Sequence, residues 1–91
     1  MIQRTIVVEN KLGLHARAAA KLVHLTSRFS SDIHVSRDGY QQAIDCKSIL
    51  GVLMLAASKG TRLILSINGK DEMEASDAIG RLFAAKFGEE S

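Results

Sequence analysis

Short stretches in which hydrophobic and polar residues alternate predict three β-strands, and a hairpin turn predicts one more. The hydrophobic positions of these stretches are Ile2, Ile6, Val8, Ile33, Val35, Leu63, Leu65 and Ile67. Turn-forming residues follow the first stretch at 10–13 and the last at Asn68-Gly69. Asp38-Gly39 predicts a tight hairpin that leads into a third strand over 40–45, because both residues tolerate a positive φ. We expect the second and third strands to pair antiparallel.

Three other segments carry hydrophobic residues at the helical period. They run from Ala16 to about Arg28, from Ser48 to about Ala57, and from Asp71 to Gly88. Ser48 is a residue type that caps helices, and Asp71 with Glu74 three residues later resembles a capping box. The element order βαββαβα predicts an α+β fold with an antiparallel or mixed sheet and helices on one face. At 91 residues we expect a single domain over 1–91.

Composition narrows the function. The formal charge of +2 comes without a Lys/Arg block or aromatic platform, so nucleic acid is not the expected ligand. Cys46 is the chain's one cysteine, which excludes an internal disulfide, and no metal-ligand spacing or cofactor motif accompanies it. The N-terminus lacks an apolar signal-peptide core, and no run is long enough to span a bilayer. We expect a cytoplasmic monomer that contacts no membrane.

Candidate chemistry concentrates around His15. The first strand, the glycine turn at 10–13 and the start of a helix follow one another, so His15 is expected near the N-cap, where several backbone N–H groups have no helical partner. A phosphate there would meet those donors and the positive end of the helix dipole. Arg17 adds a charged fork suited to phosphate oxygens. The same field favours a neutral imidazole, whose free nitrogen is a nucleophile.

Two other interpretations of these residues remain open. His15 could simply cap the helix while Arg17 is solvated, although histidine is not a leading N-cap residue. The chain could also be an acylphosphatase-like hydrolase on a similar scaffold, which would need its own phosphate loop with an arginine and a water-orienting asparagine. The glycine turn at 10–13 presents a histidine at the start of its helix instead.

Two motifs give the chain a resemblance to a known family. Residues 13–17, Gly-Leu-His-Ala-Arg, and residues 47–52, Lys-Ser-Ile-Leu-Gly-Val, resemble the two signatures of the HPr phosphocarriers of the bacterial phosphotransferase system, including the NPr branch. The resemblance covers nearly the whole chain. It implies an open-faced β-sandwich, with a four-stranded antiparallel sheet and three helices on one face. It also implies a phosphohistidine at His15 assisted by Arg17.

In that family Enzyme I, charged by phosphoenolpyruvate, donates the phosphoryl group and EIIA-type domains accept it. The resemblance therefore implies a carrier without independent enzymatic turnover. A regulatory NPr-like module, whose partners read its phosphorylation state, is the alternative. One position departs from the family, because Ala18 stands where proline commonly follows the motif arginine. We expect the site to survive with altered stiffness or phosphate affinity.

Two surfaces and one serine are candidate interaction sites. A basic row on the first helix, Arg17, Lys21, His24 and Arg28, could dock acidic partners or could simply be solvated. The second helix is too apolar for one core, and the resemblance implies partner contacts at Ile49, Leu50 and Leu53. The alternative is that Met54 and Leu55 fill the core. Ser48 is expected to cap its helix, and it matches the serine that HPr kinase/phosphorylase modifies in some bacteria.

Overall fold

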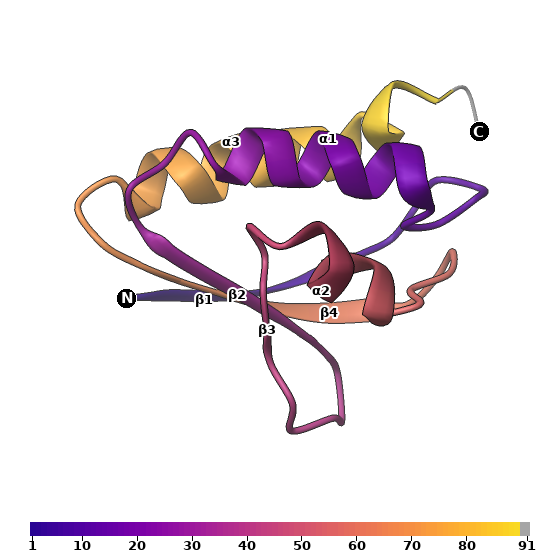
Figure 1. Cartoon of the computed structure of the whole chain (residues 1–91), viewed down its shortest axis with the longest axis horizontal. Coiled ribbons are helices and arrows are strands. Elements are labelled where there is room, and N and C mark those ends of the chain that lie inside the picture. Colours follow the sequence, from indigo (N-terminus) through magenta and orange to yellow (C-terminus); the bar gives the residue numbers. More distant parts are fainter. Residues whose placement is uncertain (90–91) are drawn as a thin grey trace.

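The chain folds into a four-stranded antiparallel sheet with three α-helices over one of its faces (Figure 1). This is a computed structural model, and it describes residues 1–89. The strands are β1 (Ile2–Val7), β2 (Asp32–Arg37), β3 (Ile44–Asp45) and β4 (Arg62–Asn68). The helices are α1 (Ala16–Thr26), α2 (Ile49–Met54) and α3 (Glu72–Ala84), followed by a 3-10 turn, η1 (Lys86–Gly88). The predicted α+β open-faced sandwich is confirmed.

The sheet has the order β1-β4-β2-β3, so β4 is an inner strand of the sheet although it is the last strand in the sequence. Its alternation is the clearest in the sequence: Leu63, Leu65 and Ile67 are at most 1% exposed and face the helices. Side chains from α1 and α3, such as Leu22 and Ile79, cover them and are equally buried. Full burial of each such side chain stabilises the fold by about 1.5–3 kcal/mol. One hydrophobic cluster thus joins the sheet to its helices.

The third strand is much shorter than predicted. Only Ile44 and Asp45 pair with β2, opposite Val35 and His34, so the expected strand over 40–45 is wrong for 40–43. The turn at Asp38-Gly39 does form, but the chain then leaves the sheet and projects away from the helices (Figure 1). Residues 40–43 are all exposed and have no hydrophobic face to bury against a neighbouring strand. They form an irregular loop instead.

The second helix ends three residues earlier than predicted. After Met54 the backbone turns, with Ala56 at a φ of 49°. The carbonyl oxygens of Leu55 and Ala57 accept hydrogen bonds from Arg37 and from the backbone N–H of Leu14. The backbone N–H groups of Leu55 and Ala56 donate to the carbonyl oxygens of Val52 and Leu53, three residues back, so the α-helical hydrogen-bond pattern does not continue past Met54.

The predicted capping box of the third helix is also wrong. Asp71 occupies the N-cap position, but its side chain makes no capping hydrogen bond. Its carboxylate accepts from the backbone N–H and hydroxyl groups of Ser30 and Ser31, at the turn before β2. Glu72 accepts from the backbone N–H of Gly69 instead. Asp71 therefore joins two loops at one end of the sheet.

The opposite end of the molecule brings the start of α1 together with the end of the chain. In Figure 1 the C-terminal segment, in yellow, lies beside the loop that enters α1. None of the helices within residues 1–89 has both the length and the apolar composition needed to cross a membrane.

Candidate functional site

A sharp turn at Gly13 presents His15 at the start of α1. Gly13 has a φ of 68°, in the left-handed region that favours glycine, and its backbone lies against that of residues 57–58. The next residue, Leu14, is buried and donates its N–H to the carbonyl oxygen of Ala57 over 2.8 Å. The turn is thereby fixed on the core, and His15 follows it in extended conformation as the N-cap of α1.

The two nitrogens of the His15 ring have different partners. Nδ1 accepts from the backbone N–H of Arg17 over 3.3 Å, which confirms the predicted N-cap position. Nε2 lies 2.6 Å from Oε2 of Glu89, whose carboxylate was not among the predicted site residues. A nitrogen that accepts has a lone pair, and a nitrogen facing a carboxylate carries a proton. The contacts therefore select the tautomer with hydrogen on Nε2 and a lone pair on Nδ1.

Glu89 is itself held by Asn10. The Nδ2 group of Asn10 lies 3.2 Å from each carboxylate oxygen of Glu89 and donates to the Gly13 carbonyl oxygen over 2.8 Å. The pKa of the Glu89 carboxyl is lowered, chiefly by the hydrogen bond from His15, while partial burial opposes the shift and Asn10 adds to it. The carboxylate is therefore the favoured form beside the ring.

The segment after α3 folds back toward α1 and brings Glu89 to His15. Phe87 is 1% exposed and packs edge-on against Phe83, with ring centroids 4.8 Å apart. Its carbonyl oxygen accepts a 2.6 Å hydrogen bond from Nζ of Lys21 on α1. Both Lys86 and Phe87 have positive φ values, of 55° and 57°. Packing of one aromatic ring thus reverses the chain and directs Glu89 toward His15.

The predicted basic row remains on the outer side of α1, but its members are not equivalent. Arg17, His24 and Arg28 are exposed, and the Arg17 guanidinium has no hydrogen-bond or ion-pair partner among residues 1–89. Arg17 is therefore available to a ligand at His15. Lys21 is exposed too, but its amine is engaged with the C-terminal segment. It has a structural contact that the sequence did not reveal.

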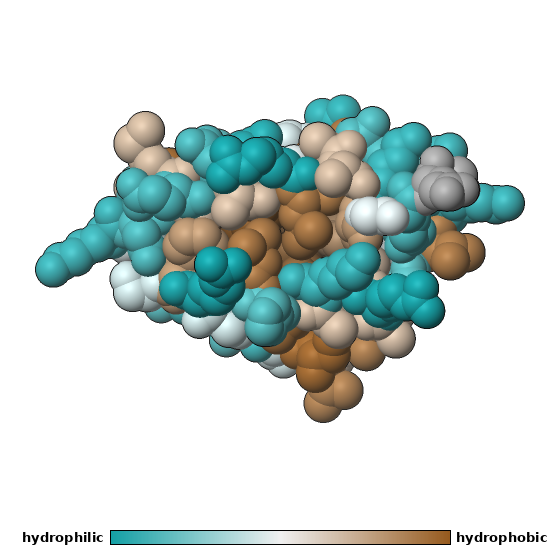
Figure 2. Space-filling model, turned by 90° about the horizontal axis from the view of Figure 1, so that it is seen from above, coloured by the Kyte–Doolittle hydropathy of each residue, from teal (hydrophilic) through white to brown (hydrophobic). Residues whose placement is uncertain are grey.

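The helix α2 exposes most of its hydrophobic side chains. Ile49, Leu50, Leu53 and Met54 are exposed, whereas Val52 and Leu55 are buried. The alternative that Met54 fills the core is therefore wrong, since 75% of it is exposed. Figure 2 shows hydrophobic side chains, in brown, gathered in the middle of the helical face and projecting at one of its edges. Ser48 caps α2 as predicted, accepting from the backbone N–H of Gly51.

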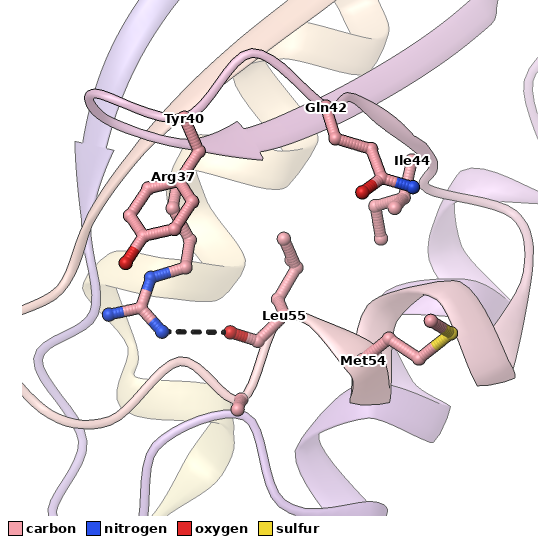
Figure 3. A pocket seen from close by; sticks show the side chains of 7 residues that line it. Arg37, Tyr40, Gln42, Ile44, Met54 and Leu55 are labelled. Carbon is pink, nitrogen blue, oxygen red and sulfur yellow. Dashed lines mark hydrogen bonds between the residues drawn. The ribbon is translucent and has the colours of Figure 1, made fainter.

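A separate hollow of about 210 Å³ opens between α2 and the loop after β2 (Figure 3). The Arg37 guanidinium lies 5.2 Å from the ring centre of Tyr40 and donates to the Leu55 carbonyl oxygen over 3.2 Å. Met54, Gln42 and Ile44 line the rest of it. No residue of the His15 turn or of α1 borders this hollow. Within residues 1–89 no cluster of His, Cys, Asp or Glu is arranged to hold a metal ion.

Sequence reasoning missed Asn10 and Glu89. Asn10 looked like an ordinary turn residue, yet it is fully buried and bonded to both Gly13 and Glu89. Glu89 lies 74 residues from His15 and carries no motif, so nothing local marked it.

Comparisons with known proteins relate the whole chain and its fold to one family. The family described as PTS HPr component phosphorylation site matches residues 2–85. The phosphocarrier protein HPr of Cupriavidus necator is 52% identical over 89 residues, covering 98% of each chain. The crystal structure of HPr-C-His from Thermoanaerobacter tengcongensis superposes with a TM-score of 0.93 at 45% identity, covering 100% of both chains. An HPr dimer from the same organism has a TM-score of 0.76 at 45% identity, covering 98% of this chain and 100% of that one.

Proposed function

The chain belongs to the HPr family of phosphocarrier proteins of the phosphotransferase system, and we propose that it accepts a phosphoryl group on His15 from Enzyme I and passes it to EIIA-type domains. Family membership makes it a carrier rather than a turnover enzyme. The observation that carries the proposal is the position of His15 at the N-cap of α1, with a lone pair on Nδ1. We place this activity in the cytoplasm, in a single domain over residues 1–91.

Nδ1 is the proposed phosphorylated atom. Nε2 faces the Glu89 carboxylate, which would repel an incoming phosphoryl group, whereas Nδ1 faces the helix N-terminus. The 3.3 Å hydrogen bond from the Arg17 N–H to Nδ1 is long and therefore weak. Little hydrogen-bond energy is lost when the lone pair of Nδ1 forms a bond to phosphorus instead. The released N–H then becomes a donor for a phosphoryl oxygen.

The Arg17 side chain is the proposed partner of the phosphoryl oxygens. Arg17 follows the N-cap by two residues, its side chain is exposed, and its planar fork matches two oxygens at once. Ala18 is fully buried and packs in the core. Because alanine does not fix φ, we expect Ala18 to affect the transfer rate rather than the choice of acceptor atom.

The partner surface is proposed to combine the basic row of α1 with the exposed apolar side chains of α2. Lys21, His24 and Arg28 supply positive charge, while Ile49, Leu50 and Leu53 supply apolar contact area. Such a surface is complementary to a partner surface that has exposed hydrophobic side chains surrounded by acidic residues. Association should weaken as salt rises, because exposed charges are screened. A monomeric carrier is also part of the proposal.

The decisive experiment is incubation with Enzyme I and phosphoenolpyruvate, followed by intact-mass measurement with and without acid treatment. We expect one acid-labile phosphoryl adduct on the parent chain and none on His15→Ala. His34→Ala, which removes an exposed histidine on β2, outside the proposed partner surface, serves as the matched control and should be modified like the parent. An adduct that persists in His15→Ala, or its absence from the parent, would overturn the proposal.

Adding EIIA-type domains to the phosphorylated chain separates carrier from regulator. A carrier loses its phosphoryl group to the acceptor, whereas a regulatory NPr-like module keeps it. Modification of Ser48 by HPr kinase/phosphorylase is a further proposal. Ser48 is partly exposed, and a phosphate there would add negative charge to a surface that is proposed to bind acidic partners.

A further inference from the structure

We propose that Glu89 is a positioning residue for His15, holding the proton on Nε2 and stabilising the positive charge that the ring acquires when Nδ1 takes the phosphoryl group. This inference rests on the proposed phosphorylation of His15. It adds the C-terminal segment to the site, through a side chain 74 residues away from the histidine.

Both nitrogens of the His15 ring have a hydrogen-bond partner. The Glu89 carboxylate lies 2.6 Å from Nε2, and the Arg17 backbone N–H lies 3.3 Å from Nδ1. With the proton on Nδ1 instead, that N–H would face another donor and the carboxylate would face a lone pair. The opposite tautomer is therefore disfavoured at both nitrogens. The lone pair stays on the nitrogen that faces the helix N-terminus.

The carboxylate also favours the product of the transfer. The lone pair on Nδ1 forms a bond to phosphorus, while the donor's own bond to phosphorus breaks and leaves its electron pair on the donor. Nε2 keeps its proton throughout, so the neutral ring becomes a phosphorylated imidazolium with one formal positive charge. A carboxylate that accepts a hydrogen bond from Nε2–H stabilises that cation more than it stabilises the neutral ring. An interaction that strengthens as charge develops accelerates the step.

Two energetically unfavourable features lie close to the Glu89 carboxylate in the structure. Lys86 and Phe87 both adopt left-handed backbone conformations, which are rare for residues with large side chains. Asn10 directs its Nδ2 group to Gly13 and Glu89, and this leaves its buried Oδ1 without a partner among residues 1–89. Both features lie directly around Glu89. Such strain is typical of a site under functional constraint.

Two variants of Glu89 separate its two contributions. Glu89→Ala removes both the acceptor and the charge. Glu89→Gln removes the charge but keeps a side-chain oxygen that accepts from Nε2–H. Glu9→Ala is the charge-matched control, because Glu9 is exposed and has no hydrogen bond or ion pair through its side chain within residues 1–89. All three changes leave the hydrophobic core intact.

The first readout is the tautomer of His15, from ¹⁵N NMR at about pH 9, above the range in which imidazole ordinarily titrates. The parent, Glu9→Ala and Glu89→Gln should hold the proton on Nε2, while Glu89→Ala should show a mixture. The second readout is the rate of phosphoryl transfer from phosphorylated Enzyme I. We expect it to fall roughly ten-fold in Glu89→Ala and by a smaller factor in Glu89→Gln, as for loss of a charge-assisted hydrogen bond.

A parent-like rate in Glu89→Ala overturns the inference, and so does an unchanged tautomer, because any rate loss would then have another cause. The proposed function fails separately, if the parent itself forms no phosphohistidine; the tautomer measurement still decides the role of Glu89 in that case. A reciprocal check uses His15→Ala. Loss of the ring should raise the pKa of the Glu89 carboxyl toward its ordinary value of 4.5, since the His15 hydrogen bond is the largest cause of its lowering.

Discussion

Replacing Gly13 with alanine tests whether the turn that presents His15 depends on the absence of a side chain. Gly13 has a φ of 68°, and a Cβ there would overlap the carbonyl oxygen of Ala57 and lie 2.9 Å from the Cα of Ser58. Both obstacles are backbone atoms, so no side-chain rotation can relieve them. The turn must move away from residues 57–58.

The cost of this change has three parts. The left-handed conformation costs an alanine about 1 kcal/mol. Moving the turn away from residues 57–58 breaks the 2.8 Å hydrogen bond from the Leu14 N–H to the Ala57 carbonyl oxygen, which costs about 1 kcal/mol of stability. Strain in the displaced packing adds at least about 1 kcal/mol. The variant should therefore lose about 3 kcal/mol of unfolding free energy, or roughly 12–24 °C in Tm for a chain of this size.

Thermal and urea unfolding, followed by circular dichroism, measure this loss. Gly60→Ala is the matched control, because Gly60 has a φ of 92° but nothing lies within 4 Å of the position a Cβ would take. It should lose only about 1 kcal/mol, from backbone conformation alone. Equal losses in the two variants would refute the argument that close backbone contact fixes the turn. A displaced turn should also slow phosphorylation of His15 in Gly13→Ala, which Gly60→Ala should leave unchanged.

Three further predictions concern other parts of the molecule. Hydrogen bonds from Ser31 and Ser30 lower the pKa of Asp71 from 3.8 to about 2, so the stability that its carboxylate contributes is present above pH 3.8 and is lost as the pH falls toward 2. Urea unfolding at several pH values should therefore show a smaller loss of stability over that interval for Asp71→Ala than for the parent. Burial raises the pKa of the Cys46 thiol to about 12, so a thiol reagent should modify Cys46 only after unfolding, and rapid labelling of the native protein would contradict this. Ser48→Ala removes the side-chain cap of α2 and should cost about 1 kcal/mol in thermal unfolding, whereas Ser48→Asn should restore much of it.

The element order was predictable because it depends on local patterns. The alternation of β4 and the helical period of α1 survive in the fold, since both reflect which side chains reach the core. The errors lie where tertiary contacts compete with local preference. Arg37 and Leu14 hold the segment that follows α2 through the carbonyl oxygens of Leu55 and Ala57, and Ser30 and Ser31 draw the Asp71 carboxylate away from its own helix. No local pattern encodes these partners.

The candidate site was predictable in part, for the same reason. His15, its helix and Arg17 are adjacent in sequence, so a glycine turn before a helix was sufficient to suggest them. Glu89 reaches the ring only because burial of Phe87 holds two residues in left-handed conformations. That geometry follows from packing between distant segments, and it has no signature in the sequence.

The central claim is that His15 carries phosphate on Nδ1, the nitrogen that faces the start of α1. Its most direct test is NMR of the chain labelled with ¹⁵N-histidine and phosphorylated by Enzyme I and phosphoenolpyruvate. The account predicts coupling of one phosphorus to Nδ1 of His15, with a proton retained on Nε2 beside Glu89. Coupling to Nε2, or to His24 or His34, would contradict it.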